Sequence, residues 1–319
     1  MSFSSKVKEE LAAVDDAGRH CRLAELAAIT GACGRLQFEQ GSAVCLELHT
    51  ENGAAARKCF TLLRKTFNIE RMETSAVQSV AVGKSSGRIM RITGREQAAA
   101  IAQAIKAVPA ADSASSFSIS GLVAQNTCCK RAFIRGAFLA AGSVSDPEKA
   151  YHFEVVYSER GRAEQLKDII NSFSMDAKII LRKRYYVVYV KEGAQIVDLL
   201  NIMGAHISLM NFENIRILKE MRNSINRQVN CEAANIHKTV RAASRQIDDI
   251  IYIRDNMGFD GLAEGLEETA RLRIGYPEAS LKELGEMMSV PLGKSGVNHR
   301  LKKLSSIADD LRGMKEDGT

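Results

Sequence analysis

The hydrophobic and polar positions divide the chain into a first part of mixed periodicity and a second part of helical periodicity. Up to about residue 215, apolar residues at helical spacing alternate with short segments in which they recur at every second position, as in 43–49. A repeat of three to four residues is typical of an amphipathic helix, and a repeat of two is typical of a half-buried strand. The first part is therefore predicted to be α+β, and the residues after about 216 are predicted to be almost wholly helical.

The order of these patterns occurs twice in the first part. In the first copy, a helix ending at Gly34 precedes a strand at 43–49, a helix at about 54–67, strands at 77–82 and 89–93 joined by a turn at 83–87, and a helix at about 96–107. In the second copy, a helix at about 128–141 precedes a strand at 151–158, a helix at 163–173, a hairpin at 177–190 and a helix at 193–203. A small, polar connector, 110–116, separates the copies. This repetition predicts a pseudo-twofold αββαββα domain, with repeat one at 1–112 and repeat two at 113–215.

The tail is predicted to be a separate helical domain at 230–319, reached through a linker at 216–229. Apolar residues at three- and four-residue steps predict one long amphipathic helix from about Glu232 to Arg254, with Asn230 as its N-cap. Its polar face carries Lys238, Arg241 and Arg245. That face is predicted to be a solvated helix surface, although it could also lie along DNA or pack on the first domain. A further helix is predicted at 262–274.

The end of the tail shows a helix-turn-helix pattern. Ser280 and Glu283 form a capping-box signature before an apolar stripe. The turn 289–293 follows, and a helix at 294–304 places Val297, Leu301 and Leu304 on one face. Two helices joined by a tight turn at this spacing are typical of DNA-binding domains.

The residue types on this second helix suit DNA. Positions 294–304 hold four basic residues and no acidic one. Asparagine can bond bidentately to adenine, and lysine suits phosphates. A basic surface helix in a small bundle is the alternative interpretation. The candidate DNA-binding residues of the tail are Ser280, Lys282, Lys294, Ser295, Asn298, His299, Arg300, Lys302 and Lys303.

A second basic cluster occupies the predicted tip of the 177–190 hairpin. Arg182, Lys183 and Arg184 precede two tyrosines. These side chains could contact backbone phosphates. A solvated turn flanked by tyrosines that pack on their own sheet is the alternative. Arg88 and Arg91 of the first repeat are weaker candidates.

Composition narrows the class of protein. The net charge of +6 permits a polyanionic partner without requiring one. No apolar run is long enough to span a membrane, so a cytoplasmic protein is expected, with nucleoid association if it binds DNA. The seven cysteines form no CxxC pair and are expected to be reduced thiols. His20 and Cys21 are adjacent, but no second ligand pair follows at a zinc-site spacing. No cofactor, metal or small-molecule substrate is expected.

The two small-residue helices, 26–34 and 134–142, lie 108 residues apart and each ends at a glycine. Their register resembles that of the LAGLIDADG homing endonucleases, in which an acidic residue before the final glycine of each helix holds a catalytic divalent metal. Cys33 and Ala141 occupy these positions here. A thiol and a methyl group cannot replace carboxylates as ligands of Mg²⁺. The resemblance therefore implies a retained scaffold without nuclease chemistry, unless carboxylates such as Asp146 or Glu148 have taken over.

With both parts in view, the chain resembles the bacterial WhiA family, a degenerate LAGLIDADG domain followed by a helix-turn-helix. The segments that carry this resemblance are 2–11, 135–147, 230–235 and 294–301. It implies a non-catalytic, double-stranded-DNA-binding transcription regulator with a role in sporulation, cell division or chromosome segregation. Two alternatives stay open. The chain could be an active metal-dependent endonuclease, or its first domain could be a platform for a partner regulator while the tail alone binds DNA.

Overall fold

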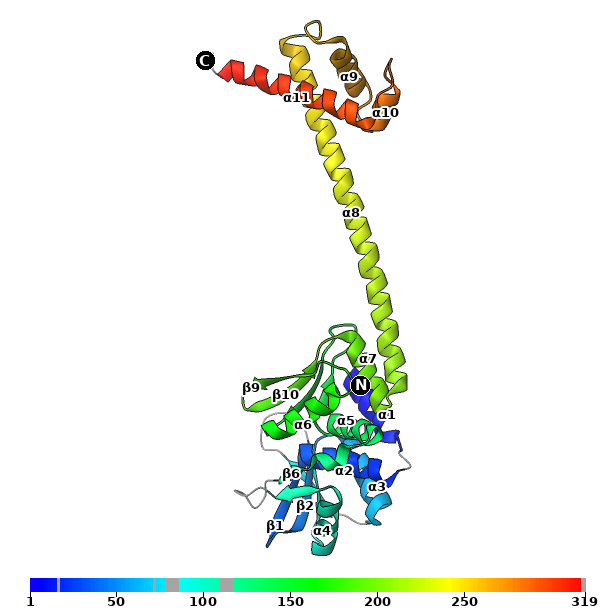
Figure 1. Cartoon of the computed structure of the whole chain (residues 1–319), viewed down its shortest axis with the longest axis vertical. Coiled ribbons are helices and arrows are strands. Elements are labelled where there is room, and N and C mark those ends of the chain that lie inside the picture. Colours follow the sequence, from blue (N-terminus) through cyan, green and yellow to red (C-terminus); the bar gives the residue numbers. More distant parts are fainter. Residues whose placement is uncertain (16–17, 71–72, 79–85, 110–116, 317–319) are drawn as a thin grey trace. The chain divides into compact units, whose positions relative to one another are not determined.

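The computed structural model describes residues 1–15, 18–70, 73–78, 86–109 and 117–316, and the side chains of all of these except 74–78, 86–88 and 314–316. The chain forms two compact units, Met1–Glu220 and Met221–Thr319 (Figure 1). The first is α+β and the second is helical, which confirms the predicted fold class. Both predicted repeats lie within the first unit. The predicted turn 83–87 and connector 110–116 fall largely or wholly outside the described residues.

The first repeat contains two long helices that flank a four-stranded sheet. Its elements in chain order, after α1 (Phe3–Ala13), are α2 (Arg19–Cys33), β1 (Gly34–Glu39), β2 (Ser42–Thr50), α3 (Gly53–Phe67), β3 (Glu73–Gln78), β4 (Ser86–Ile92) and α4 (Arg95–Ala104). The strands are antiparallel in the order β1-β2-β4-β3. Apolar residues of β2 alternate toward the core, with Leu46 and Leu48 fully buried.

The second repeat restates this arrangement. After the short pair β5 (Ala107–Pro109) and β6 (Phe117–Ile119) and the 3₁₀ turn η1 (Gly121–Ala124), its elements are α5 (Thr127–Ala141), β7 (Gly142–Val144), β8 (Phe153–Tyr157), α6 (Arg160–Asn171), β9 (Lys178–Arg182), β10 (Tyr185–Val190) and α7 (Gly193–Met203). The sheet order, β7-β8-β10-β9, matches that of the first repeat element for element. The predicted duplication is confirmed.

Three features of the repeats differ from the prediction. The strand predicted at 77–82 lies at Glu73–Gln78 in the described part of the chain. β1 begins directly at Gly34, so the first strand of each repeat continues from the motif helix without a loop. The final helix of repeat one ends at Ala104 rather than Ala107, because Ala107 pairs with Ile119 in the β5–β6 ribbon. Short edge pairings of this kind depend on residues distant in sequence, and periodicity does not reveal them.

The two motif helices, α2 and α5, pack directly against each other in the core of the first unit (Figure 1). Small residues make this approach possible. A Cβ atom placed on Gly136 would lie 2.4 Å from the backbone oxygen of Glu25 and 3.1 Å from the Cβ of Ala28. Only a glycine fits at that contact, which explains why the helix carries one in its interior despite the entropic cost.

Helix α8 (His206–Asn256) corrects the expectation for the start of the tail. The predicted N-cap, Asn230, lies in the middle of this 51-residue helix and caps nothing. The segment 216–229, expected to be a linker, is also helical, although the boundary between the compact units falls within it. The predicted apolar stripe is only partly covered: Ile250 is fully buried, whereas Ile236 and Val240 are exposed.

The second unit has its own hydrophobic core. The end of α8 packs with α9 (Glu264–Gly275), α10 (Leu281–Glu286) and α11 (Lys294–Glu316). Buried side chains include Ile250, Leu284, Val297, Leu301 and Leu304. The core positions predicted on the last helix are therefore confirmed. In the described part of the chain, no helix combines the length and the apolar character that a membrane crossing requires.

Candidate nucleic-acid interface

The α10–turn–α11 segment has the local structure that its sequence predicts. The Ser280 hydroxyl accepts a hydrogen bond from the Glu283 amide, and the Glu283 carboxylate accepts one from the Ser280 amide at 2.7 Å. These hydrogen bonds hold the pKa of Glu283 below its usual range, because they favour the ionised carboxylate. The capping box thus fixes the first residue of α10.

A close backbone contact closes the turn between the two helices. The Leu292 amide donates to the Gly285 carbonyl at 3.0 Å. A Cβ on Gly285 would lie 2.0 Å from the Leu292 carbonyl oxygen, so any side chain at that position would push the helices apart. Because Val297 and Leu301 are buried behind this turn, the orientation of α11 is fixed by packing as well as by the backbone.

The solvent face of α11 carries most of the predicted side chains. The exposed residues among them are Lys294, Ser295, His299, Lys302 and Lys303. Helical spacing places Ser295, His299 and Lys302 opposite the buried residues Val297, Leu301 and Leu304. Asn298 lies at the flank of this face and is half-buried.

Tertiary structure gathers several of the candidates around one depression of about 560 Å³ in the second unit. Ser280, Lys282, Lys294 and Asn298 line it together with Lys238 of α8. Three lysines therefore meet at a single concave surface beside the one asparagine suited to base recognition. From the sequence, Lys238 was noted only as a residue of the polar face of its helix. Its position beside α10 and α11 depends on tertiary packing, which the sequence pattern does not reveal.

Arg300 differs from the other candidates. Its guanidinium is half-buried and donates from Nη1 to the Gly265 carbonyl at 3.0 Å. The same nitrogen lies 3.6 Å from the Met288 sulfur. Arg300 thus joins α11 to α9 inside the domain.

The basic hairpin tip is exposed, and two of its three cations have partners. Arg182, at the end of β9, lies 3.4 Å from the carboxylate of Glu154 on β8, across the intervening strand β10. Arg184 stacks over the Tyr185 ring at 5.4 Å and donates to its hydroxyl. Lys183 occupies the turn with a positive φ of 57°. On the first repeat, Arg91 pairs with Glu47 at 2.7 Å, and the Arg88 side chain lies outside the described part of the structure.

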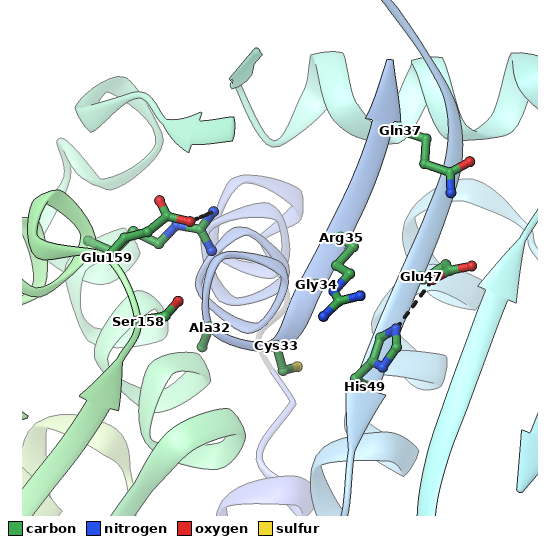
Figure 2. A pocket seen from close by; sticks show the side chains of 10 residues that line it. Ala32, Cys33, Gly34, Arg35, Gln37, Glu47, His49, Ser158 and Glu159 are labelled. Atoms are coloured by element: carbon green, nitrogen blue, oxygen red, sulfur yellow. Dashed lines mark hydrogen bonds and ion pairs between the residues drawn. The ribbon is translucent and has the colours of Figure 1, made fainter. Parts of the chain in front are cut away.

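The positions that resemble a nuclease centre lie at the C-terminal ends of α2 and α5. Cys33 and Ala32 border a hollow of about 850 Å³ in the first unit (Figure 2). Burial raises the pKa of the Cys33 thiol to about 12, so this sulfur is neutral at physiological pH. Lys8 is electrostatically coupled to it, and burial lowers the pKa of that lysine to about 8. A neutral thiol near a lysine ammonium is unsuited to hold a hard divalent cation.

The carboxylates around this hollow are already paired. Figure 2 shows Glu47 and Glu159 on opposite sides of the end of α2. Glu47 bonds His49 at 3.3 Å and Arg91 at 2.7 Å, whereas Glu159 lies 3.0 Å from Arg162. Asp146, considered as a relocated ligand, instead accepts the Glu148 amide at 3.0 Å in its own turn. Among the described side chains, no group of three metal-binding residues lies at this position.

One group of metal-binding side chains does lie elsewhere in the first unit. His20, Cys21, Cys128 and Cys129 place one ligand atom each within 4.8 Å of all the others. No second ligand pair at a zinc-site spacing follows His20–Cys21 in the sequence. The folded chain instead brings the Cys128–Cys129 dipeptide, 108 residues away, to His20 and Cys21.

Fold and site together define a class: a degenerate LAGLIDADG-like unit followed by a helix-turn-helix unit. Models of three domains match the chain, namely the WhiA N-terminal LAGLIDADG-like domain at 19–106, the WhiA LAGLIDADG-like domain at 130–222 and the WhiA C-terminal HTH domain at 225–308. The chain belongs to the WhiA family, as its sequence resemblance implied.

Similar proteins agree with this assignment over the full length. "Probable cell division protein WhiA" of Lachnoclostridium phytofermentans is 60% identical, over 98% of this chain and 100% of that protein. The crystal structure of full-length DUF199/WhiA from Thermatoga maritima is similar with a TM-score of 0.59 and 25% identity, covering 97% of this chain and 99% of that one. A second structure, of the N-terminal LAGLIDADG domain of DUF199/WhiA, has a TM-score of 0.50 and 21% identity over 64% of this chain and 90% of that one.

Proposed function

We propose that this protein is a non-catalytic, sequence-preferring binder of double-stranded DNA that regulates transcription in connection with cell division. The observation that carries the proposal is the face of the second unit where Lys238, Lys282 and Lys294 meet around Asn298. Lysine ammonium groups bind phosphates through charge, and the asparagine amide can read a base edge. The names of the similar proteins and their helix-turn-helix domain support this function.

The roles of the residues follow from their positions. Asn298, with Ser295 and His299 on the adjoining solvent face of α11, would contact base edges in the major groove. Lys302, Lys303 and the lysines of the depression would neutralise phosphates. Ser280 contributes by capping α10, and Arg300 by holding α11 against α9.

The first unit would act without cleaving DNA. Cys33 and Ala141 replace the acids of the resembling nucleases, and the nearby carboxylates Glu47 and Glu159 are held by cations. The exposed Lys183, with Arg182 and Arg184, would add phosphate contacts at the hairpin tip, or this unit would bind a partner regulator. In either case the protein would be associated with the nucleoid and would need no cofactor for DNA binding.

The test is affinity capture of sheared genomic DNA by the full chain with Mg²⁺ present, followed by sequencing of the recovered ends. We expect discrete enriched fragments with random ends, whose shared sequence defines the site. Recurrent new ends at one position would show that cleavage survives, and uniform recovery of all fragments would remove sequence preference. A full-chain variant with Arg182, Lys183 and Arg184 changed to alanine separates the roles of the first unit: unchanged capture would favour the partner platform.

A further inference from the structure

A sulfur-rich cluster joins the two repeats of the first unit. The Nδ1 atom of His20 lies 3.2 Å from the sulfur of Cys129, 3.3 Å from that of Cys21 and 3.9 Å from that of Cys128. All four ligand atoms lie within 4.8 Å of one another. Cys21 and Cys129 are buried, whereas His20 and Cys128 are exposed. The cluster therefore has a protein side and a side open to solvent.

The cluster obeys the pseudo-symmetry of the fold. His20 and Cys128 are 108 residues apart, the same separation as the motif glycines, and so are Cys21 and Cys129. His20 and Cys21 lie in the first turn of α2, which begins at Arg19, and Cys128 and Cys129 lie in the first turn of α5, which begins at Thr127. The helix-packing contact at Gly136 therefore brings two equivalent dipeptides together, one from each repeat.

The distances suit one tetrahedral ion. With Zn–S bonds of about 2.3 Å and a Zn–N bond of about 2.0–2.1 Å, ligand atoms at the corners of a tetrahedron are separated by roughly 3.5–3.8 Å. The three separations from His20 Nδ1, 3.2–3.9 Å, bracket this range. Three cysteines and one histidine form a common ligand set of structural zinc sites.

The cluster lies at two helix N-termini. His20 and Cys21 are in the first turn of α2, and Cys128 and Cys129 are in the first turn of α5. The partial positive charge of a helix N-terminus stabilises a thiolate. Hard cations such as Mg²⁺ prefer oxygen ligands, and the cluster offers none from its four side chains. The solvent-exposed edge at His20 and Cys128 provides an entry path for the ion.

We propose that His20, Cys21, Cys128 and Cys129 bind one structural Zn²⁺ that ties the N-terminal ends of α2 and α5 together. The ion closes the site with four protein ligands, so it has no open position for substrate. It lies at the end of the helix pair opposite Cys33 and Ala141, where the resembling nucleases carry out their chemistry.

The role follows from the length of chain that the ion closes. A cross-link between His20–Cys21 and Cys128–Cys129 encloses almost the whole first repeat, and a link across a long segment restricts the unfolded chain strongly. Metal binding also releases the thiol protons, so affinity for zinc falls as the pH is lowered. The expected signature is a first unit whose thermal transition moves to lower temperature when zinc is removed.

The test begins with the full chain purified under reducing conditions without added metal, and its zinc content is measured by inductively coupled plasma mass spectrometry. We expect about one zinc per chain in the wild type. Cys128→Ser should lose it, whereas Cys231→Ser should keep it, since Cys231 is an exposed cysteine of the second unit. His20→Cys is the rescue variant: a Cys₄ set also binds zinc, so this variant should retain the ion and the thermal transition.

Cobalt substitution gives a readout of the ligands themselves. After removal of zinc and addition of Co²⁺, tetrahedral thiolate coordination produces intense visible bands and a sulfur-to-cobalt charge-transfer band. These should appear in the wild type and in Cys231→Ser, and should be absent from Cys128→Ser. Circular dichroism of each variant shows whether the helices are retained, so loss of metal can be distinguished from loss of fold.

Three results would overturn the proposal. One is a folded wild type without zinc that also fails to take up Zn²⁺ or Co²⁺ when titrated. Another is zinc that persists in folded Cys128→Ser at the wild-type ratio. The third is a disulfide among Cys21, Cys128 and Cys129 in protein isolated with thiols alkylated at lysis. It would be detected as an intact mass with two fewer alkyl groups and located by a disulfide-linked peptide in a digest, and it would show that the cluster is a redox pair instead.

Discussion

Arg135 of α5 donates two hydrogen bonds to the carboxylate of Glu25 on α2, from Nε to Oε1 and from Nη2 to Oε2, each at 3.0 Å. Both side chains are buried, Glu25 completely. Arg135 also donates to the Met203 carbonyl at 3.2 Å, and Lys58 lies 3.4 Å from Glu25. This bidentate pair fixes the register of one repeat against the other in the middle of the core.

Breaking that pair should destabilise the first unit. Arg135→Met leaves the Glu25 charge buried with less compensation, and we expect the free energy of unfolding to fall by about 3–5 kcal/mol. Chemical unfolding followed by circular dichroism measures this. Arg160→Met, which removes an exposed helix-surface pair with Glu164, is the control and should unfold like the wild type. Equal stability of wild type and Arg135→Met would contradict the role assigned to the pair.

Gly136 of α5 and Gly31 of α2 allow a matched test of the close contact between these two helices. Gly136→Ala should cost about 1–3 kcal/mol, because the new Cβ would lie 2.4 Å from the Glu25 backbone oxygen and must move the helices apart. Gly31→Ala meets only Ile119 Cγ1 at 3.5 Å, an ordinary contact. It should be neutral or stabilise by up to about 1 kcal/mol through helix propensity. Thermal unfolding of both variants measures these changes in stability. If Gly136→Ala and Gly31→Ala lost similar amounts of stability, the close helix contact at Gly136 would not be the cause.

The half-buried Lys8 should give the protein a characteristic pH dependence. Burial lowers the pKa of this lysine in the folded state from 10.5 to about 8. Between these values the unfolded chain binds more protons than the folded one, so the free energy of unfolding should rise with pH. Below pH 8 both states are protonated and the lysine contributes no slope.

The cysteine next to Lys8 acts in the opposite direction at higher pH. Burial raises the pKa of Cys33 from 9.0 to about 12, so the folded state keeps this proton and stability falls with pH above 9. The measurement is therefore unfolding at closely spaced pH values from 7.5 to 9, chosen on either side of the folded pKa of about 8. Lys8→Met should lack the rise, and a rise of the same slope in that variant would exclude Lys8 as its source.

Asn298 and Lys302 should affect DNA binding differently. Asn298→Ala is expected to relax sequence preference and to cost about 1–3 kcal/mol on the best site only, because a base contact carries the sequence information. Lys302→Ala should weaken all sequences alike and reduce the slope of log affinity against log salt by about 1. Fluorescence anisotropy on the captured site and on a scrambled duplex separates the two effects.

Lys149→Ala provides the control for both variants, since this exposed lysine lies in the loop after β7 and outside the proposed interface. Its binding curves should match those of the wild type at each salt concentration. If neither Asn298→Ala nor Lys302→Ala differs from this control, α11 is not the element that reads DNA.

Much of the geometry of the candidate DNA-binding site could not be predicted from local sequence patterns. The capping box at Ser280 and Glu283, the turn and the buried face of α11 were all predictable, because residues within a few positions determine them. The inward position of Arg300 was not, since its partner Gly265 lies 35 residues away. Lys238 joins Lys282 and Lys294 for the same kind of reason: its helix meets α10 and α11 only in the folded domain.

Periodicity, glycine turns and caps act over a few residues, so the duplication, the α+β class of the first unit and the helix-turn-helix were all predictable from the chain. The resemblance to LAGLIDADG nucleases also implied that Cys33 and Ala141 replace acids. The continuation of α8 through Asn230 was missed because asparagine occurs inside helices as well as at N-caps. Two further features were visible only in the folded structure: Glu25 meets Arg135, and Cys128 and Cys129 complete a ligand set with His20. Both depend on the packing of helices whose contacting residues are more than 100 positions apart, for which no short spacing in the chain gives a signal.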